Sequence, residues 1–186
     1  MKNLIILAAL VCSQIFFSQV IIGDNAGTAT NKTSVLLEFA NTGNKGIILP
    51  YVRTIPATPS EGTIILDATD ATKAKVKYYN GVVGTNSPDG WQDLSGTTAD
   101  VTTEITKQPT ETQVTEGDAK AIIGATSSTA DGVLVLESNT KAMVLPMVAN
   151  TNDVPNPSPG MMVFVNKSGF KRLAVYNGNT WAYWKP

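Results

Sequence analysis

Histidine is absent from the 186 residues, and cysteine occurs once, at Cys12. Without histidine the chain has neither a catalytic triad that depends on an imidazole nor a zinc site of the Cys/His type. A lone cysteine also excludes a framework of internal disulfides, so the fold must depend on packing and strand pairing. The sequence therefore favours a binding or structural protein over an enzyme, and it predicts no cofactor.

Charge is also scarce. Charged side chains make up 16% of the chain, the net charge is −1, and charges of one sign are nowhere grouped into a block. Such a surface has no electrostatic attraction for nucleic acid, so no nucleic-acid partner is expected. Thr, Asn, Ser and Gly fill the polar positions, a composition typical of extracellular β structure.

The N-terminus carries the features of a secretory signal peptide. Lys2 precedes an apolar stretch at 4–11, and the small residue Ser18 predicts cleavage near Ser18 or Gln19. Residues 1–19 are therefore predicted as a signal peptide, because the apolar run is too short to span a membrane convincingly. A retained signal anchor and a lipid attached to Cys12 stay open as alternatives. We expect a protein that is secreted or held at the outer cell surface.

After this segment the sequence repeats itself. The landmarks of the first copy are Glu38, Lys45 to Pro50, Gly62 to Ile65, Tyr79 to Gly81 and Trp91. They return in the second copy as Glu137, Lys141 to Pro146, Gly160 to Val163, Tyr176 to Gly178 and Trp181. The offset falls from 99 residues between Glu38 and Glu137 to 90 between Trp91 and Trp181. This pattern predicts one folding unit that was duplicated before its loops diverged.

Each copy reads as a series of short strands. β-branched or aromatic runs closed by turn residues predict strands at 35–39, 46–49, 63–66, 75–79, 91, 133–136, 143–145, 161–165, 172–176 and 181–184. No window has apolar residues at helical spacing over three turns, so few or no helices are expected after the signal peptide. The predicted fold is all-β, with small modules at 20–95 and 121–186 joined by a Thr-rich extended linker at 96–120.

Two of the predicted strands indicate a need for partners. The runs at 46–49 and 161–165 are apolar at consecutive positions, so both of their faces require cover. A module of this size buries a low fraction of its surface and has little material to cover them. We therefore expect the other copy, or another chain in a homo-oligomer, to cover the second face.

The acidic residues form no recognisable site. Glu38 and Glu137 hold equivalent places, but a symmetric pair is better explained by one structural role used twice than by a glycosidase dyad. The acidic turns near Asp24 and Asp67 lack the spacing of a calcium loop. No catalytic or metal-binding residue is predicted.

Aromatic residues near the C-terminus are the main candidates for contact with a ligand or partner. Trp91 and Trp181 are landmarks of the repeat and are best explained as plugs that close each core, although an interface or a sugar-stacking surface remains open. Trp184 has no equivalent tryptophan in the first copy, where Leu94 falls three residues after Trp91, and is therefore the best candidate for a contact outside its module. The candidate contact residues are Trp181, Tyr183, Trp184 and Arg53.

These landmarks also resemble a known kind of protein. The order of Glu38, Lys45 to Pro50, Gly62 to Ile65 and Tyr78 to Gly81 is similar to a β unit of small exported proteins of Bacteroidota, and to segments of phage tail fibres and cell-surface fibres. Such fibres are often homotrimeric, so the resemblance implies a non-enzymatic structural or adhesive surface protein that forms a trimer. The alternative is a secreted carbohydrate-binding module that uses the aromatic C-terminal hairpin to bind a glycan partner.

Overall fold

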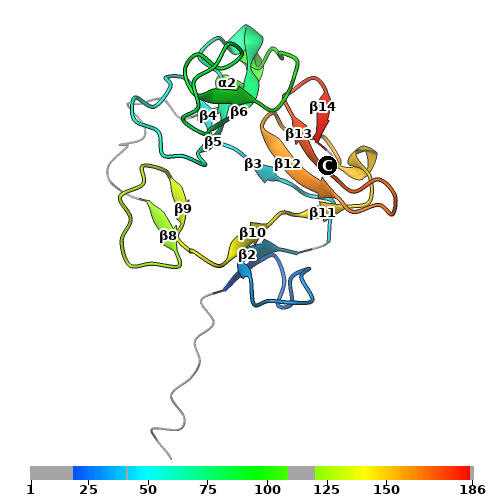
Figure 1. Cartoon of the computed structure of the whole chain (residues 1–186). Coiled ribbons are helices and arrows are strands. Elements are labelled where there is room, and N and C mark those ends of the chain that lie inside the picture. The colour runs from blue at the N-terminus through cyan, green and yellow to red at the C-terminus, as the bar shows by residue number, and fades with distance from the viewer. Residues whose placement is uncertain (1–18, 41, 109–119, 185–186) are drawn as a thin grey trace, which may run out of the picture.

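The computed structural model describes residues 19–40, 42–108 and 120–184. Over these residues the fold is nearly all β, with short strands, several parallel pairings and a single short α-helix, so that the arrangement resembles a β-solenoid (Figure 1). The all-β class predicted from the sequence is confirmed. Most of the predicted signal peptide lies outside the described residues. Within them, no helix is both long and apolar enough to cross a bilayer.

The described residues form fourteen strands, seven from each half of the chain. The first half forms β1 (Val20–Ile22), β2 (Val35–Phe39), β3 (Ile47–Ile48), β4 (Tyr51–Val52), β5 (Ile64–Asp67), β6 (Lys75–Tyr79) and β7 (Trp91–Asp93). The second half forms β8 (Ala121–Ile123), β9 (Leu134–Leu136), β10 (Ala142–Val144), β11 (Met147–Val148), β12 (Met161–Val165), β13 (Arg172–Tyr176) and β14 (Trp181–Trp184). The sequence missed β1, β4, β8 and β11, which have only two or three residues each and pair in parallel with a later strand.

The strand order repeats between the halves. β4 pairs in parallel with β5, which continues through antiparallel β6 and β7, and β11 to β14 follow the same order and directions. The register repeats as well, because Tyr79 lies opposite Trp91 and Tyr176 lies opposite Trp181. The repeated landmarks of the sequence thus correspond to repeated strand pairings.

The halves also exchange strands, so that two of the four sheets of the described residues combine strands of both halves. β3 leaves the first half to pair with β12, and β10 leaves the second half to pair with β2 (Figure 1). One apolar cluster accordingly mixes residues of both halves, including Leu66, Val76, Met162 and Val175. A second cluster, centred on Val163 and Ala174, belongs to the second half alone. The larger apolar core is therefore shared between the two copies.

The first part of the Thr-rich segment is more structured than the sequence predicts. Ala99 pairs with Ala74 through two backbone hydrogen bonds of 2.8 and 3.0 Å. Val101 is fully buried in the shared cluster, and the short helix α2 (Thr102–Ile105) follows it. Residues 109–119 of the predicted linker lie outside the described residues. Ala99, Val101 and Ile105 all pack into the shared cluster, so this stretch lies on the first half although it has few apolar residues.

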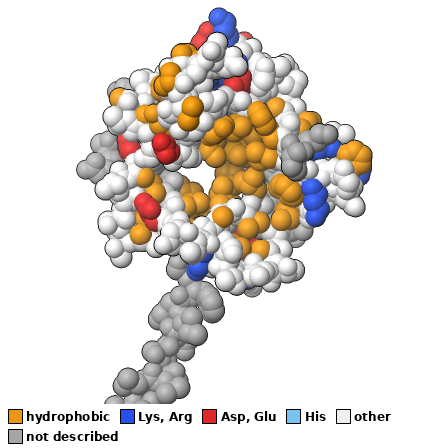
Figure 2. All heavy atoms as spheres, in the orientation of Figure 1, with side chains coloured by type: hydrophobic (Ala, Val, Ile, Leu, Met, Phe, Trp, Pro, Cys, Tyr) orange, Lys and Arg blue, Asp and Glu red, His pale blue; other side chains and the backbone are white. Residues whose placement is uncertain are grey.

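One face of the molecule shows where apolar groups gather. In Figure 2 hydrophobic side chains form a continuous surface near the centre of this face, in the region of β3 and β12. The molecule is open beside this surface, toward the β8 and β9 pair (Figure 2). β9 and β3 are thus separated within the chain.

Candidate functional site

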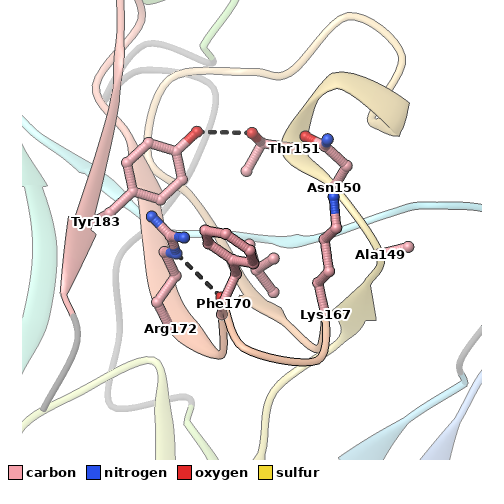
Figure 3. A pocket seen from close by; sticks show the side chains of 8 residues that line it. Ala149, Asn150, Thr151, Lys167, Phe170, Arg172 and Tyr183 are labelled. Carbon is pink, nitrogen blue, oxygen red and sulfur yellow. Dashed lines mark hydrogen bonds between the residues drawn. The ribbon is translucent and has the colours of Figure 1, made fainter.

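A hollow of about 270 Å³ lies on the second half of the chain, beside the turn between β12 and β13 (Figure 3). Its lining residues are Ala149, Asn150, Thr151, Val165, Lys167, Phe170, Arg172 and Tyr183. They come from β12, β13, β14, the β12–β13 turn and the segment around the 3-10 helix η2 (Thr151–Asp153). The hollow therefore depends on segments that lie as many as 34 residues apart in sequence, from Ala149 to Tyr183.

Cations and aromatic rings face one another in this hollow (Figure 3). The guanidinium carbon of Arg172 lies 5.2 Å from the ring centre of Tyr183 and 5.4 Å from that of Phe170. Lys167 Nζ lies 5.7 Å from the same Phe170 ring. These distances place each cation over a ring face, where the ring quadrupole attracts it. The Tyr183 hydroxyl is also hydrogen-bonded to Thr151 Oγ1 at 2.7 Å.

At the equivalent position in the first half, an ion pair is found instead of the hollow. The strand registers make Lys75 equivalent to Arg172 and Asp93 equivalent to Tyr183. Lys75 Nζ lies 2.7 Å from Asp93 Oδ2, so the first half has a salt bridge where the second has a cation over a ring. Burial raises the pKa of Asp93, but hydrogen bonds from Lys75 and from Ser95 outweigh it and hold the pKa below its usual value.

The lining residues include no carboxylate and no activated nucleophile. Their chemistry suits binding through cation–π contacts and hydrogen bonds. Across the described residues, no group of three or more acidic or cysteine side chains is placed to hold a metal ion.

The structure separates the four residues singled out in the sequence. Tyr183 lines the hollow, whereas Trp184 is 48% exposed and its indole N–H donates to the Leu94 carbonyl at 2.7 Å. Trp181 is half-buried and packs on the core of the second half, with its ring centre 5.2 Å from that of Tyr176. Arg53 lies elsewhere and donates from Nη2 to the Ile105 carbonyl at 2.7 Å. Only Tyr183 therefore takes part in the hollow.

Thr151, Lys167, Phe170 and Arg172 line the hollow but were not predicted. Lys167 and Phe170 belong to a turn with no landmark of the repeat, and Arg172 has an ordinary lysine as its counterpart. A signal was available in the substitution of Asp93 by Tyr183, which removes the carboxylate partner of the neighbouring cation. This loss of a carboxylate is visible when equivalent positions of the paired strands are aligned between the two copies.

The contacts of Glu38 indicate a structural role. Its carboxylate is fully buried and accepts hydrogen bonds from the amides of Thr28 and Ala29 at 2.8 and 2.9 Å, from Lys32 Nζ at 2.5 Å and from the Gln19 side chain. Burial raises the pKa of Glu38, but the hydrogen bond from Lys32 and those from the two amides outweigh it, so the pKa lies below its usual value. The carboxylate thus ties the loop after β1 to β2.

The equivalent Glu137 has a simpler environment. It is half-buried and accepts a hydrogen bond from the Ser128 hydroxyl, in the loop between β8 and β9. Both glutamates therefore contact the loop that precedes their own strand, as expected for one structural role used twice.

The comparisons with known proteins concern the second half. Residues 122–185 match the family model of the phage tail like trimerisation region. The match covers about a third of the chain, from β8 to β14, and corresponds to the second copy of the repeat. No curated protein and no solved structure matches the chain. The second half is thus similar to a trimerisation region of phage tail type, a likeness that supports a structural, fibre-type, oligomeric protein.

Proposed function

We propose that this protein is a structural fibre-type protein that assembles as a homotrimer and acts at the outer cell surface, where it serves adhesion. The observation that carries the proposal is the match of residues 122–185 to a trimerisation region of phage tail type. The absence of histidine and the lack of a carboxylate in the hollow support a role without catalysis.

The packing of the chain supports an oligomer independently of the match. Three large apolar residues are at least half exposed: Ile48 at 52%, Val133 at 74% and Leu134 at 50%. All three lie in or beside strands that the repeat uses for pairing. Exposed strand edges with apolar side chains favour association with another chain.

The trimer is tested by light scattering on the purified protein after size-exclusion chromatography. The expected mass is three times the mass of one chain, measured on the same sample by denaturing mass spectrometry. A monomer at micromolar concentration would contradict the proposal. A stable dimer would contradict the trimer in particular.

Export is tested separately in the source cells. We expect the N-terminus of the protein recovered from the envelope or medium to begin near Gln19 or Val20, since cleavage is predicted near Ser18. Protease added to intact cells should remove the protein if it is held at the outer surface. Full-length protein protected from the protease inside the cells would contradict both parts.

A further inference from the structure

Two strand edges are covered within the chain by strands of the other half. β10 pairs in parallel with β2, with Met143 opposite Leu37, and β3 pairs antiparallel with β12, with Ile48 opposite Met161. The covered strand β2 is deeply buried, and Leu37 is 0% exposed. Each half therefore donates one short strand to the other.

The edge of β9 that corresponds to the covered edge of β2 is open. Among the described strands, β9 pairs only with β8. Backbone hydrogen bonds join Val133 and Glu137 to β8, and alternation along a strand then turns the backbone groups of Leu134 and Leu136 to the other edge. Leu134 is 50% exposed, whereas the equivalent Val35 in β2 is 4% exposed. This difference in exposed fraction is expected when one neighbouring strand is missing.

The edge of β5 that corresponds to the covered edge of β12 is open as well. β4 covers β5 at Leu66 and Asp67, but no described strand continues this edge to Ile64, the equivalent of Met162. The glycines at the start of the strands show the same difference. A Cβ built on Gly160 would lie 3.3 Å from the Leu66 Cβ, whereas one built on the equivalent Gly62 has nothing within 4 Å.

Among the described strands, β3 and β10, which could fill these edges, are each paired on one side only. The Leu49 N–H donates to the Gly160 carbonyl at 3.1 Å, and the Ala142 N–H donates to the Ser34 carbonyl at 2.8 Å. In the repeat Leu145 is equivalent to Leu49, three residues beyond Ala142. Backbone groups an odd number of residues apart point to opposite edges of a strand. β10 therefore leaves open the edge that β3 uses, and β3 leaves open the edge that β10 uses.

From this complementarity we propose that a second copy of this chain fills both open edges. β10 of one chain pairs antiparallel with β5 of the next, and β3 of that next chain pairs in parallel with β9 of the first. The contact between chains then repeats the contact between the halves of one chain. The number of chains rests on the proposed function, which is a trimer. Because the interface joins two different edges, three chains form a closed ring when the rotation between neighbouring chains brings the third chain back to the first. The opening beside β9 leaves space for the incoming strand (Figure 2).

The side chains at the new contact fit the exchange. A Cβ built on Gly46 would lie 2.5 Å from Met161 Cγ, so β3 requires glycine against β12. In the proposed contact Ala142 takes the place of Gly46, and the shorter Thr63 takes the place of Met161. The carbonyl oxygen of Met162, 2.8 Å from the same Cβ position, has Ile64 O as its counterpart. The Ala142 methyl group needs room beside this carbonyl, so β10 should lie slightly farther from β5 than β3 lies from β12.

Cysteine cross-linking tests the pairing in the full chain carrying Cys12→Ser. Thr63 and Val144 are the equivalents of Met161 and Ile48, which lie opposite each other. Opposite Cα atoms in antiparallel strands are about 4.5–5.5 Å apart, which is within the range of a disulfide. A mixture of Thr63→Cys and Val144→Cys chains, unfolded and refolded together, should form a disulfide-linked dimer on oxidation. The chain with both substitutions should form a ladder that ends at a covalent trimer.

The matched control is Ile48→Cys with Met161→Cys, which should yield a cross-linked monomer. Each single variant alone should yield no specific cross-link. If the parent is a trimer by light scattering but the Thr63 and Val144 cysteines do not cross-link, the pairing is wrong and the proposed function stands. A monomeric parent would overturn both. A ladder that continues beyond the trimer would overturn the closed ring, and cross-links between chains in the control would overturn the pairing of β3 with β12 inside one chain.

Discussion

The indole N–H of Trp184 donates a 2.7 Å hydrogen bond to the carbonyl of Leu94, the residue that holds the equivalent position in the first copy. The two ends of the repeated units are thus joined directly. A second tie lies nearby, where the buried Asn177 side chain donates to the Thr97 carbonyl at 2.8 Å. The C-terminal hairpin is therefore fixed to the first half by polar contacts that connect residues 80 and 90 positions apart.

Replacing Trp184 by phenylalanine should weaken this tie. The change removes the N–H donor and keeps an aromatic ring, so we expect the free energy of unfolding to fall by about 0.5–1.5 kcal/mol, the usual net value of one hydrogen bond. Urea denaturation at fixed protein concentration measures it. An unchanged midpoint and slope would show that the bond contributes nothing to stability.

Replacing Trp91 by alanine should be far more costly than the same change at Trp181. Trp91 is 4% exposed and packs against Tyr79 with ring centres 5.2 Å apart, whereas Trp181 is half-buried in an equivalent contact with Tyr176. Removing a buried tryptophan costs about 3–5 kcal/mol. Thermal or urea unfolding of the two variants should show the larger loss for Trp91→Ala. Equal losses would contradict the different burial of the two rings.

Gly46→Ala should disturb the pairing of β3 with β12. The added methyl group would meet Met161 Cγ at 2.5 Å and the Met162 carbonyl oxygen at 2.8 Å, so the strands must move apart. Overpacking of this kind costs about 1–3 kcal/mol. The matched control is Gly84→Ala, because Gly84 has nothing within 4 Å of its added Cβ. Comparable losses in unfolding free energy for both variants would contradict the close approach at Gly46.

Glu38→Gln should change how stability depends on pH. The folded pKa of Glu38 lies below the ordinary value of 4.5, so its carboxylate stabilises the fold above that value, and the contribution is lost as pH falls through the lowered pKa. The variant should be less stable than the parent at neutral pH, and the difference should shrink below about pH 4.5. Urea midpoints measured from pH 7 to pH 3 give this difference.

The matched control for this curve is Glu137→Gln. Glu137 is only half-buried and accepts from Ser128, whereas Glu38 accepts from four donors. We therefore expect a smaller loss of stability at neutral pH for Glu137→Gln. A difference between parent and Glu38→Gln that stays constant with pH would contradict the lowered pKa.

Local sequence was sufficient for the class of fold and for most strands. The runs at 75–79, 161–165, 172–176 and 181–184 form strands with the predicted bounds, because β-branched and aromatic residues favour that local geometry. Asn-Gly turns end two of them, at 80–81 and 177–178. The strands that were missed have two or three residues each, and all four pair in parallel with a strand that follows them in the chain. Their signal is in the partner and not in their own residues.

The sequence by itself determined an all-β chain whose two copies share turns, apolar runs and closing tryptophans, since these depend on backbone preferences of neighbouring residues. The tertiary structure alone decided that β3 pairs with β12 and β10 with β2, that Val101 enters the shared core, and that Arg172 meets Tyr183. The reason is physical. The two copies present nearly the same apolar edges, so local pattern cannot say which edge each strand takes, and the choice depends on fits such as the space that Gly46 leaves for Met161.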